Sequence, residues 1–330
     1  MIETVLVKGA RAWRSVAGNG TTVEKFVKRR YRKAIRVERG RLATQYSNQD
    51  SVVIQAKSNP EDKRGIYMKG GCDLPSLFLA GPMIKDVLEQ GTVAIARPTV
   101  AVGTSQTSQV LQTLEGIPEE HIVETCRKLQ IRPTFFKPTL FDETFEAGGM
   151  ERFGDFPKSA VVLSVGSDLT RSLHRHREHG FLVDIGGWWL NQSLDKAIQD
   201  VETVKWFKKT FEPVGKMTIP EFASNMELIV KHLRDQLGSH LIVMNTLVVE
   251  PLSPTHNFQL LNEDHVTRKR MFNIALADLS KSQGFHVIDV DRILKENGVR
   301  DQVDFAHFPV EGKMPVAKEA FRIFRELEIV

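Results

Sequence analysis

The chain has 330 residues, of which 41% are hydrophobic and 26% charged, which is typical of a globular protein and excludes a disordered or fibrous one. No stretch approaches 18 uncharged apolar residues, and the first residues lack a long apolar segment with a cleavage pattern, so we expect neither a membrane span nor a secretory signal. Only two cysteines occur, Cys72 and Cys126, which argues against a disulfide framework and favours the cytoplasm.

Residues 1–64 are predicted to form a basic N-terminal appendage. The formal net charge of +4 is concentrated there, because residues 25–39 form a strongly basic run. We interpret this run as a solvated helix face with Phe26, Ile35 and Val37 turned inward. The alternative is a docking element for an acidic partner or an anionic substrate, whereas nucleic acid is not expected. The polar stretch 58–64 predicts a loop that ends the appendage.

From Gly65 to residue 330, short apolar runs alternate with helical patterns. We predict buried strands over residues 66–68, 92–96, 159–165, 239–249 and 285–290. We predict helices over residues 77–88, 108–114, 119–128, 220–236, 264–283 and 315–327. Residues 170–220 are hard to place, and we expect insertions near 130–158 and 180–220. The alternation predicts a parallel sheet covered on both faces, with ligands bound at the carboxyl ends of the strands.

The first turn of chemical interest follows the strand predicted at residues 66–68. Gly70 and Gly71 let the chain turn sharply, and Cys72 would then lie at the beginning of a helix. Backbone N–H groups at such a position lower the pKa of a thiol and can bind an oxyanion. The alternative is that Cys72 is a small buried residue at a tight turn.

A second group lies near the end of the chain. Asp304 and His307 are three residues apart in a predicted loop ahead of the final helix. An aspartate at this spacing can orient the imidazole of a histidine, which then acts as the base for a nucleophile. On its own the D-x-x-H pattern is weak.

In context this C-terminal block resembles that of the SGNH (GDSL-type) hydrolases, in which a strand ends in Asp and is followed by a helix, D-x-x-H, a glycine and a further helix. The matching residues are Asp289, Asp304, His307, Gly312, Val316 and Ala317. The turn 70–74 resembles the first block of that family. Cys72 then occupies the position of the serine nucleophile, and Gly71 replaces the usual aspartate.

The third block of the family, Gly-x-Asn-Asp, resembles the turn that begins at Gly166 and continues through Ser167 and Asp168. Asp168 stands where an asparagine would help to form the oxyanion hole, and an ionised carboxylate cannot donate a hydrogen bond. Either Asp168 is protonated, or another donor such as Ser167 serves, or the site does not hydrolyse esters in the usual way. Gly103 is the candidate for the glycine of the second block.

The resemblance implies a three-layer α/β/α domain over residues 65–330. It implies Cys72 as nucleophile, His307 as general base and Asp304 as the residue that orients it. The expected reaction is hydrolysis or transfer of an acyl group from an ester or thioester of a polar, carbohydrate or carrier-bound substrate, as in biosynthesis, with no cofactor and no metal. The alternatives are a non-catalytic binding protein of the same fold and a protein that acts through its basic N-terminal helix.

Four other features have alternative interpretations. The segment 174–179 carries three histidines, but their spacing on a helix suits a metal poorly, so a solvated basic helix is favoured. The segment 186–189, with two tryptophans, either lines a substrate pocket or packs in the core. Asn245 either faces the catalytic edge or is a buried amide with its hydrogen bonds made. Cys126 lies in a helical pattern and is expected to be structural.

Overall fold

We describe the protein from a computed structural model of the whole chain. The structure describes residues 51–56, 59–69, 74, 92–94, 106–129, 146–147, 151–152, 159–184, 194, 198, 200–249, 265–302 and 308–329. All of them belong to the unit Asn48–Val330, which is described by itself. The basic run 25–39 and the segment 186–189 lie outside the described residues.

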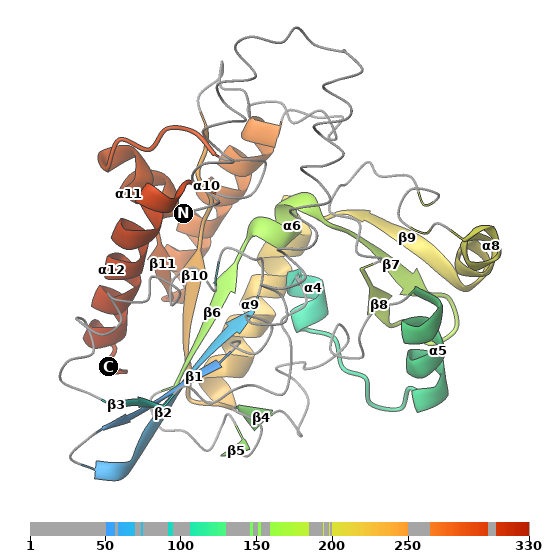
Figure 1. The fold of residues 1–330 in the computed structure, drawn as a ribbon, viewed down its shortest axis with the longest axis horizontal. Helices are drawn as coiled ribbons and strands as arrows, with labels where there is room; N and C mark the ends of the chain where they lie inside the picture. The colour runs from blue at the N-terminus through green and yellow to red at the C-terminus, as the bar shows by residue number, and fades with distance from the viewer. Residues whose placement is uncertain are drawn as a thin grey trace, which may run out of the picture. The chain divides into compact units, whose positions relative to one another are not determined.

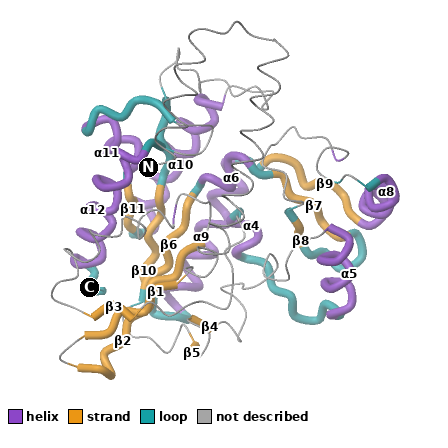
Figure 2. The backbone as a smooth tube through the Cα atoms, in the orientation of Figure 1, coloured by secondary structure: helices purple, strands orange, loops and turns teal. Residues whose placement is uncertain are grey.

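A mixed sheet forms the centre of this unit (Figures 1 and 2). Its strand order is β11-β10-β6-β2-β1-β3. These strands are β1 (Ser51–Ala56), β2 (Asn59–Lys69), β3 (Thr92–Ala94), β6 (Ala160–Ser164), β10 (His240–Met244) and β11 (His286–Ile288). Strands β2, β6, β10 and β11 run parallel, while β1 is antiparallel to β2 and to β3. The predicted α/β class with a parallel sheet is therefore confirmed.

Side chains of the central strands alternate between two hydrophobic cores. In β6, Val162 packs into the first core and Val161 into the second, and in β10 Ile242 and Val243 do the same. Strands buried on both faces in this way are apolar throughout, which is why the sequence showed them as unbroken apolar runs. Two helices, α11 (Val290–Glu296) and α12 (Val310–Glu326), contribute to the first core, and two more, α9 (Ile219–Asp235) and α10 (His265–Gln283), contribute mainly to the second. This is the predicted three-layer arrangement.

Local signals fix the ends of these helices. At the beginning of α9, Thr218 and Glu221 form a capping box in which each side chain accepts from the other residue's backbone N–H. Past the end of α10, Gly284 adopts a left-handed conformation with φ of 74°. Helix α12 begins at Val310 instead of the predicted Pro315, which lies inside the helix.

The N-terminal edge of the sheet differs from the prediction. Strand β1 and residues 59–64 of β2 belong to the sheet, although the sequence predicted residues 58–64 to be a loop. That prediction is wrong because the two strands form a hairpin, with Ser51 opposite Tyr67 and Gln55 opposite Lys63. Pairing of this kind depends on the partner strand and is not visible in local composition.

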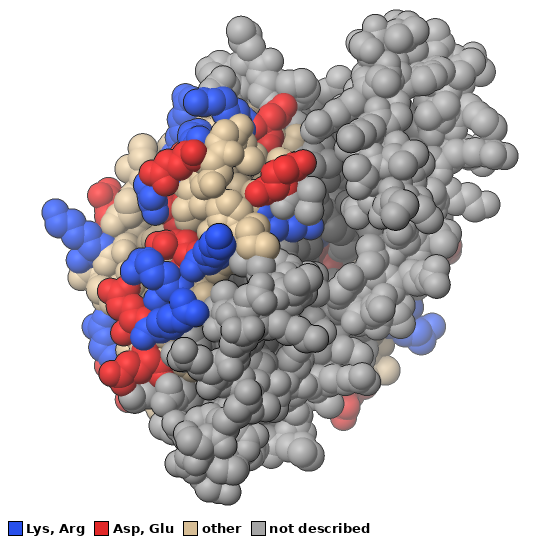
Figure 3. Space-filling model, turned by 60° about the vertical axis from the view of Figure 1, so that its left-hand side comes forward, with Lys and Arg blue, Asp and Glu red and all other residues tan. Residues whose placement is uncertain are grey.

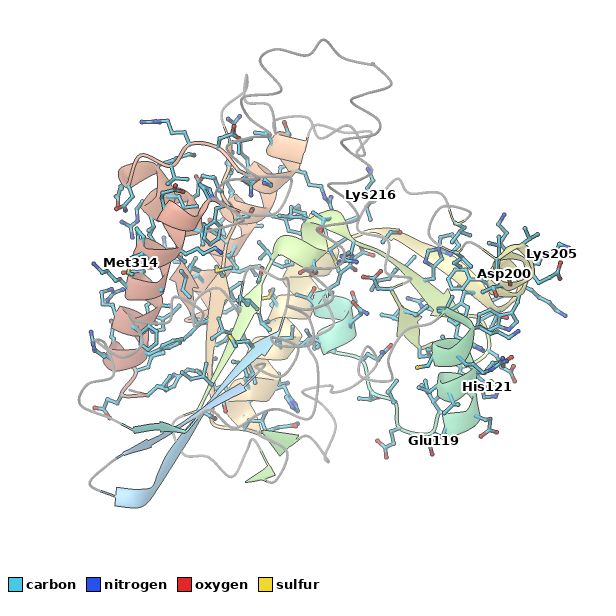
Figure 4. The ribbon with its side chains drawn as sticks, viewed as in Figure 1. Glu119, His121, Asp200, Lys205, Lys216 and Met314 are labelled. Atoms are coloured by element: carbon cyan, nitrogen blue, oxygen red, sulfur yellow. The ribbon has the colours of Figure 1, made fainter. Side chains whose placement is uncertain are left out.

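A second, antiparallel sheet occupies the region that the sequence left unassigned. It has the order β8-β7-β9, formed by β7 (Ser172–His176), β8 (Leu182–Val183) and β9 (Phe211–Lys216). Helices α5 (Glu119–Leu129) and α8 (Val201–Thr210) share its core, in which Phe207 and Phe211 stack at 4.7 Å between ring centroids. Asp200 caps the beginning of α8 (Figure 4), accepting a hydrogen bond from the backbone N–H of Thr203. Cys126 lies buried in this core, so its predicted structural role is confirmed.

The remaining described elements are short. They are α4 (Thr107–Val110), α6 (Gly166–Thr170), β4 (Glu146–Ala147) and β5 (Glu151–Arg152). Within the described ranges, no helix combines the length and apolarity needed to cross a bilayer. Lysines and arginines alternate with acidic residues over the described part of the face in Figure 3, which carries several ion pairs of α11 and α12.

Candidate functional site

The order of the strands identifies the edge of the sheet at which a ligand is expected to bind. From β2 the chain continues to β3, on one side of β2, whereas from β6 it continues to β10, on the other side. The connections therefore diverge between β2 and β6, and ligands of open α/β sheets bind outside the carboxyl ends of two such strands. Lys69 at the end of β2 pairs with Leu163, one residue before β6 ends. We call this edge the rim.

Five of the predicted site residues, Gly71, Cys72, Gly103, Asp304 and His307, lie outside the described residues. Their described neighbours still bear on the prediction. Leu74, two residues after Cys72, and Phe308, one residue after His307, are buried in the same hydrophobic core. Gly166, Ser167 and Asp168 are described and form the beginning of α6, at the carboxyl end of β6.

Hydrogen bonds from two backbone N–H groups fix the turn into α6. The backbone N–H of Val165 donates to the carbonyl of Met244 at the end of β10, at 3.2 Å. The backbone N–H of Gly166 donates to Oγ of Ser164, also at 3.2 Å. The turn is thereby tied to two adjacent parallel strands, and α6 begins directly after β6 (Figure 1).

Asp168 has an unusual environment for a carboxyl group. Its side chain is buried, and Oδ1 accepts hydrogen bonds from the backbone N–H of Thr107 at 2.9 Å and from its hydroxyl at 2.8 Å. Oδ2 is buried and has no hydrogen-bond partner. Burial raises the pKa of Asp168 to about 7, because desolvation outweighs the opposing effects of the Thr107 hydrogen bonds and of the Arg268 charge.

The neighbouring Ser167 presents a second unpaired atom. Its Oγ is buried and has no hydrogen-bond partner. A buried polar group without a partner costs about 1–3 kcal/mol and is rare in native proteins. Two such atoms occur on consecutive residues at the edge where open α/β sheets bind ligands, which makes this turn a candidate contact for a polar ligand.

Arg268, which the sequence analysis did not single out, supports this turn from the first residues of α10. Its guanidinium donates to the carbonyls of Asp168 at 3.0 Å, Leu169 at 3.1 Å and Met217 at 2.7 Å. The guanidinium also lies 4.8 Å above the ring of Phe272. Arg268 therefore joins α6, the end of the small sheet and α10. In sequence it was indistinguishable from the other basic residues of that helix.

Two polar residues organise the rim beyond β10. Asn245 donates to Oδ1 of Asp289 at 2.8 Å and accepts from the backbone N–H of Asp291 at 3.2 Å, so the interpretation as a satisfied buried amide is correct. Lys269 is buried and donates to the carbonyl of Leu247 at 3.2 Å and to Oε1 of Gln302. Lys269 therefore links Leu247, which follows β10, to Gln302, which precedes Asp304 by two residues.

The prediction of a solvated helix over residues 174–179 is wrong, because His174 and His176 lie on strand β7. Alternate residues of a strand point to opposite faces, and Arg175 is accordingly exposed while His176 is buried. His121 of α5 (Figure 4) approaches His179 to 4.1 Å and His176 to 5.8 Å between ring centroids. In the described part of the chain, no three His, Cys, Asp or Glu side chains converge in a way that could hold a metal ion.

We expect acid to destabilise the protein through His174. Burial lowers the pKa of His174 to about 4, its Nδ1 has no hydrogen-bond partner, and its ring packs against Phe207 at 4.8 Å. Between pH 6.5 and about 4, His174 is protonated in the unfolded chain but not in the folded protein. The free energy of unfolding is therefore at its full value above pH 6.5 and falls by up to about 3 kcal/mol as pH decreases to about 4. Urea unfolding of wild type and His174→Phe near pH 7 and about pH 4.5 measures this difference. Equal pH dependence in the two proteins would contradict the assignment to His174.

Comparisons with known proteins leave the function open. No protein-family model matches the chain, and no curated protein matches it. Among solved structures, the chain is similar to a mutant of Axe2, an acetyl-xylooligosaccharide esterase from Geobacillus Stearmophilus. The match has 10% sequence identity and a TM-score of 0.36, and it covers 79% of this chain and 92% of that one. A likeness this distant does not carry an activity over, and the proposal below depends on residues of the chain itself.

Proposed function

We propose that the protein is an acyl hydrolase or acyltransferase with its site at the rim. The observation that carries the proposal is the turn at Gly166–Asp168, which presents two buried, unpaired polar atoms where the strand connections diverge. The turn at Gly70–Cys72 follows the neighbouring strand β2 directly, and both strands end at the same edge. A nucleophile at Cys72 would therefore share the crevice with the β6 turn.

In this proposal Cys72 is the nucleophile, His307 the general base and Asp304 the residue that orients it. The burial of Leu74 and Phe308 in one core supports the approach of the two segments, and so does the tie from Lys269 to Gln302. His307 accepts the thiol proton, and the thiolate sulfur attacks the acyl carbon to form a tetrahedral oxyanion. His307 then returns the proton to the leaving group, which departs and leaves a thioester on Cys72. Water or an acceptor attacks this thioester and regenerates the thiol.

Several groups near the rim are candidates to bind the acyl oxygen. The backbone N–H groups of Cys72 and Ser167 are the proposed oxyanion donors. The wider set proposed for oxyanion or substrate binding is Gly71, Gly103, Gly166, Ser167 and Asp168. Donors of this kind stabilise the charge that develops in the transition state and contribute about 2.7–4 kcal/mol each. The unpaired polar atoms of Ser167 and Asp168 also favour a polar acyl donor, such as an ester or thioester on a carbohydrate or carrier.

The reactivity of Cys72 tests the proposal. We expect the alkylation of Cys72 by iodoacetamide to be fast near neutral pH and to slow in His307→Ala, because the imidazole holds the thiolate. Cys126 is the internal reference, since burial raises the pKa of its thiol. The two sites are separated by mass spectrometry of their peptides. An ordinary thiol pH profile at Cys72, unchanged by His307→Ala, would instead favour a binding protein that keeps the fold.

A further inference from the structure

Hydrogen-bond directions around Asp168 determine where its proton must lie. Nδ2 of Asn225, on α9, donates to Oγ1 of Thr107 at 3.1 Å and to Oγ of Ser108 at 2.9 Å. The Thr107 hydroxyl accepts this bond and directs its own proton to Oδ1 of Asp168. The backbone N–H of Thr107 donates to the same oxygen, so both lone pairs of Oδ1 are used. With both Thr107 bonds directed to Oδ1, the position left for a proton on Asp168 is Oδ2, the atom without a partner.

The contact between α4 and α6 fixes the orientation of the Asp168 carboxyl group. Besides the two bonds from Thr107 to Asp168, Nε2 of Gln106 donates to the carbonyl of Arg171 at 2.6 Å. Gln106 and Thr107 are both buried. The beginning of α4 thus holds the carboxyl of Asp168 and the end of α6 together, and rotation of the carboxyl would break two hydrogen bonds.

Burial disfavours the charged form of Asp168 more than the Thr107 hydrogen bonds and the Arg268 charge favour it. Oδ2 is buried without a donor. The positive charge that acts on the carboxyl comes from Arg268 of α10, which donates hydrogen bonds to the main-chain carbonyls of Asp168 and Met217. From α4 and α9, the facing groups are the uncharged Thr107 and Asn225. A carboxyl in such a site is expected to be mostly neutral below about pH 7.

We propose that Asp168 works as a neutral carboxylic acid, and that its Oδ2–H donates a hydrogen bond to the acyl oxygen of the bound substrate in place of an amide donor. This inference rests on the proposed function. A carboxylic acid kept neutral by its surroundings is known to be able to donate to an oxyanion. The proton remains on Asp168 throughout, so the role requires no additional proton acceptor. It also explains how a chain with aspartate at this position can retain the oxyanion site.

The pH dependence of two variants tests this role. In the wild type the donor is lost as Asp168 ionises, and the new negative charge repels the oxyanion, so kcat/KM should fall about tenfold per pH unit above about pH 7. In Asp168→Asn the amide donates at every pH. We therefore expect the ratio of Asp168→Asn to wild type, measured with p-nitrophenyl acetate and an acetyl thioester, to be constant below pH 7 and to rise about tenfold per unit above it. Forming this ratio cancels the titration of Cys72 and His307, which both proteins share.

Thr107→Val is the matched second variant. It keeps the shape of the side chain and the backbone donor but deletes the hydroxyl that favours the ionised form. We expect its alkaline limb to move to higher pH than in the wild type. Asp168→Ala, which removes the donor altogether, should lose about 10²–10³-fold in kcat below pH 7, and this loss should shrink at higher pH because the ionised wild type has lost the donor as well.

Infrared difference spectra separate this inference from the proposed function. A C=O stretch of a protonated carboxyl group, present in wild type, absent from Asp168→Asn and disappearing as pH rises through about 7, is expected. An active protein with no such band and a flat ratio would overturn the inference alone. A protein that shows the band but turns over neither probe would overturn the donor role together with the proposed function.

Discussion

Arg171→Met, with Asp184 left in place, should lower the free energy of unfolding by about 3–5 kcal/mol. Nη1 of Arg171 lies 2.7 Å from Oδ2 of Asp184, and the two side chains are only 5% and 1% exposed. Arg171 ends α6 and Asp184 follows β8, so the pair joins the rim turn to the small sheet. Loss of the guanidinium removes the positive charge that lies 2.7 Å from this buried carboxylate. Chemical denaturation at neutral pH measures the effect.

An exposed pair in the same small sheet provides the control. Arg177 and Glu212 are 2.9 Å apart, but their side chains are 50% and 44% exposed. Arg177→Met should therefore cost less than about 1 kcal/mol. The double variant Arg171→Met, Asp184→Leu should be more stable than Arg171→Met alone, because it leaves no unpaired buried charge. Equal losses for Arg171→Met and Arg177→Met would contradict the role assigned to burial.

Cys72→Ala and His307→Ala should each lower kcat for ester or thioester turnover by at least about 10³-fold. Residues that act as one unit are strongly non-additive, so the double variant should lose little more than either single variant. Cys72→Ser should recover part of the ester activity relative to Cys72→Ala, since a serine with the same base and orienting aspartate is the set that the resemblance implies. Steady-state kinetics with p-nitrophenyl acetate and an acetyl thioester compare these four variants with the wild type.

Cys126→Ala is the matched control for the loss of a thiol. Cys126 is buried in the core formed by α5, α8 and the small sheet, which is a different core from the one that contains Leu74 and Phe308. Its replacement should leave kcat unchanged. Equal kcat values for Cys72→Ala and wild type would exclude Cys72 as the nucleophile.

The parts of the fold that the sequence predicted well are those with local causes. The apolar runs that became β6 and β10 are buried on both faces, and such strands need no knowledge of their partners to be recognised. Helix α9 carries its own start signal in Thr218 and Glu221. The hairpin of β1 and β2 and the strand that carries His174 and His176 were missed, because their pairing depends on distant segments.

The candidate site divides in the same way. The turn of Ser167 and Asp168 was identified by its resemblance to the third block of the SGNH hydrolases, and the structure places it directly after β6. The protonation of Asp168 stayed open in sequence because it depends on burial and on Thr107, 61 positions away. The burial of Lys269 and the bridging position of Arg268 had no sequence signal, since both look like ordinary solvated residues of a helix.

The covalent intermediate is the most direct test of the central claim, that Cys72 accepts an acyl group at the rim. Wild-type protein is mixed briefly with p-nitrophenyl acetate, quenched in acid, digested and weighed by mass spectrometry. We expect one acetyl group on the peptide that contains Cys72, its loss on longer incubation, and little or none in His307→Ala. No acetyl group on Cys72, or equal labelling of Cys72 and Cys126, would contradict the claim and leave the fold as a binding scaffold.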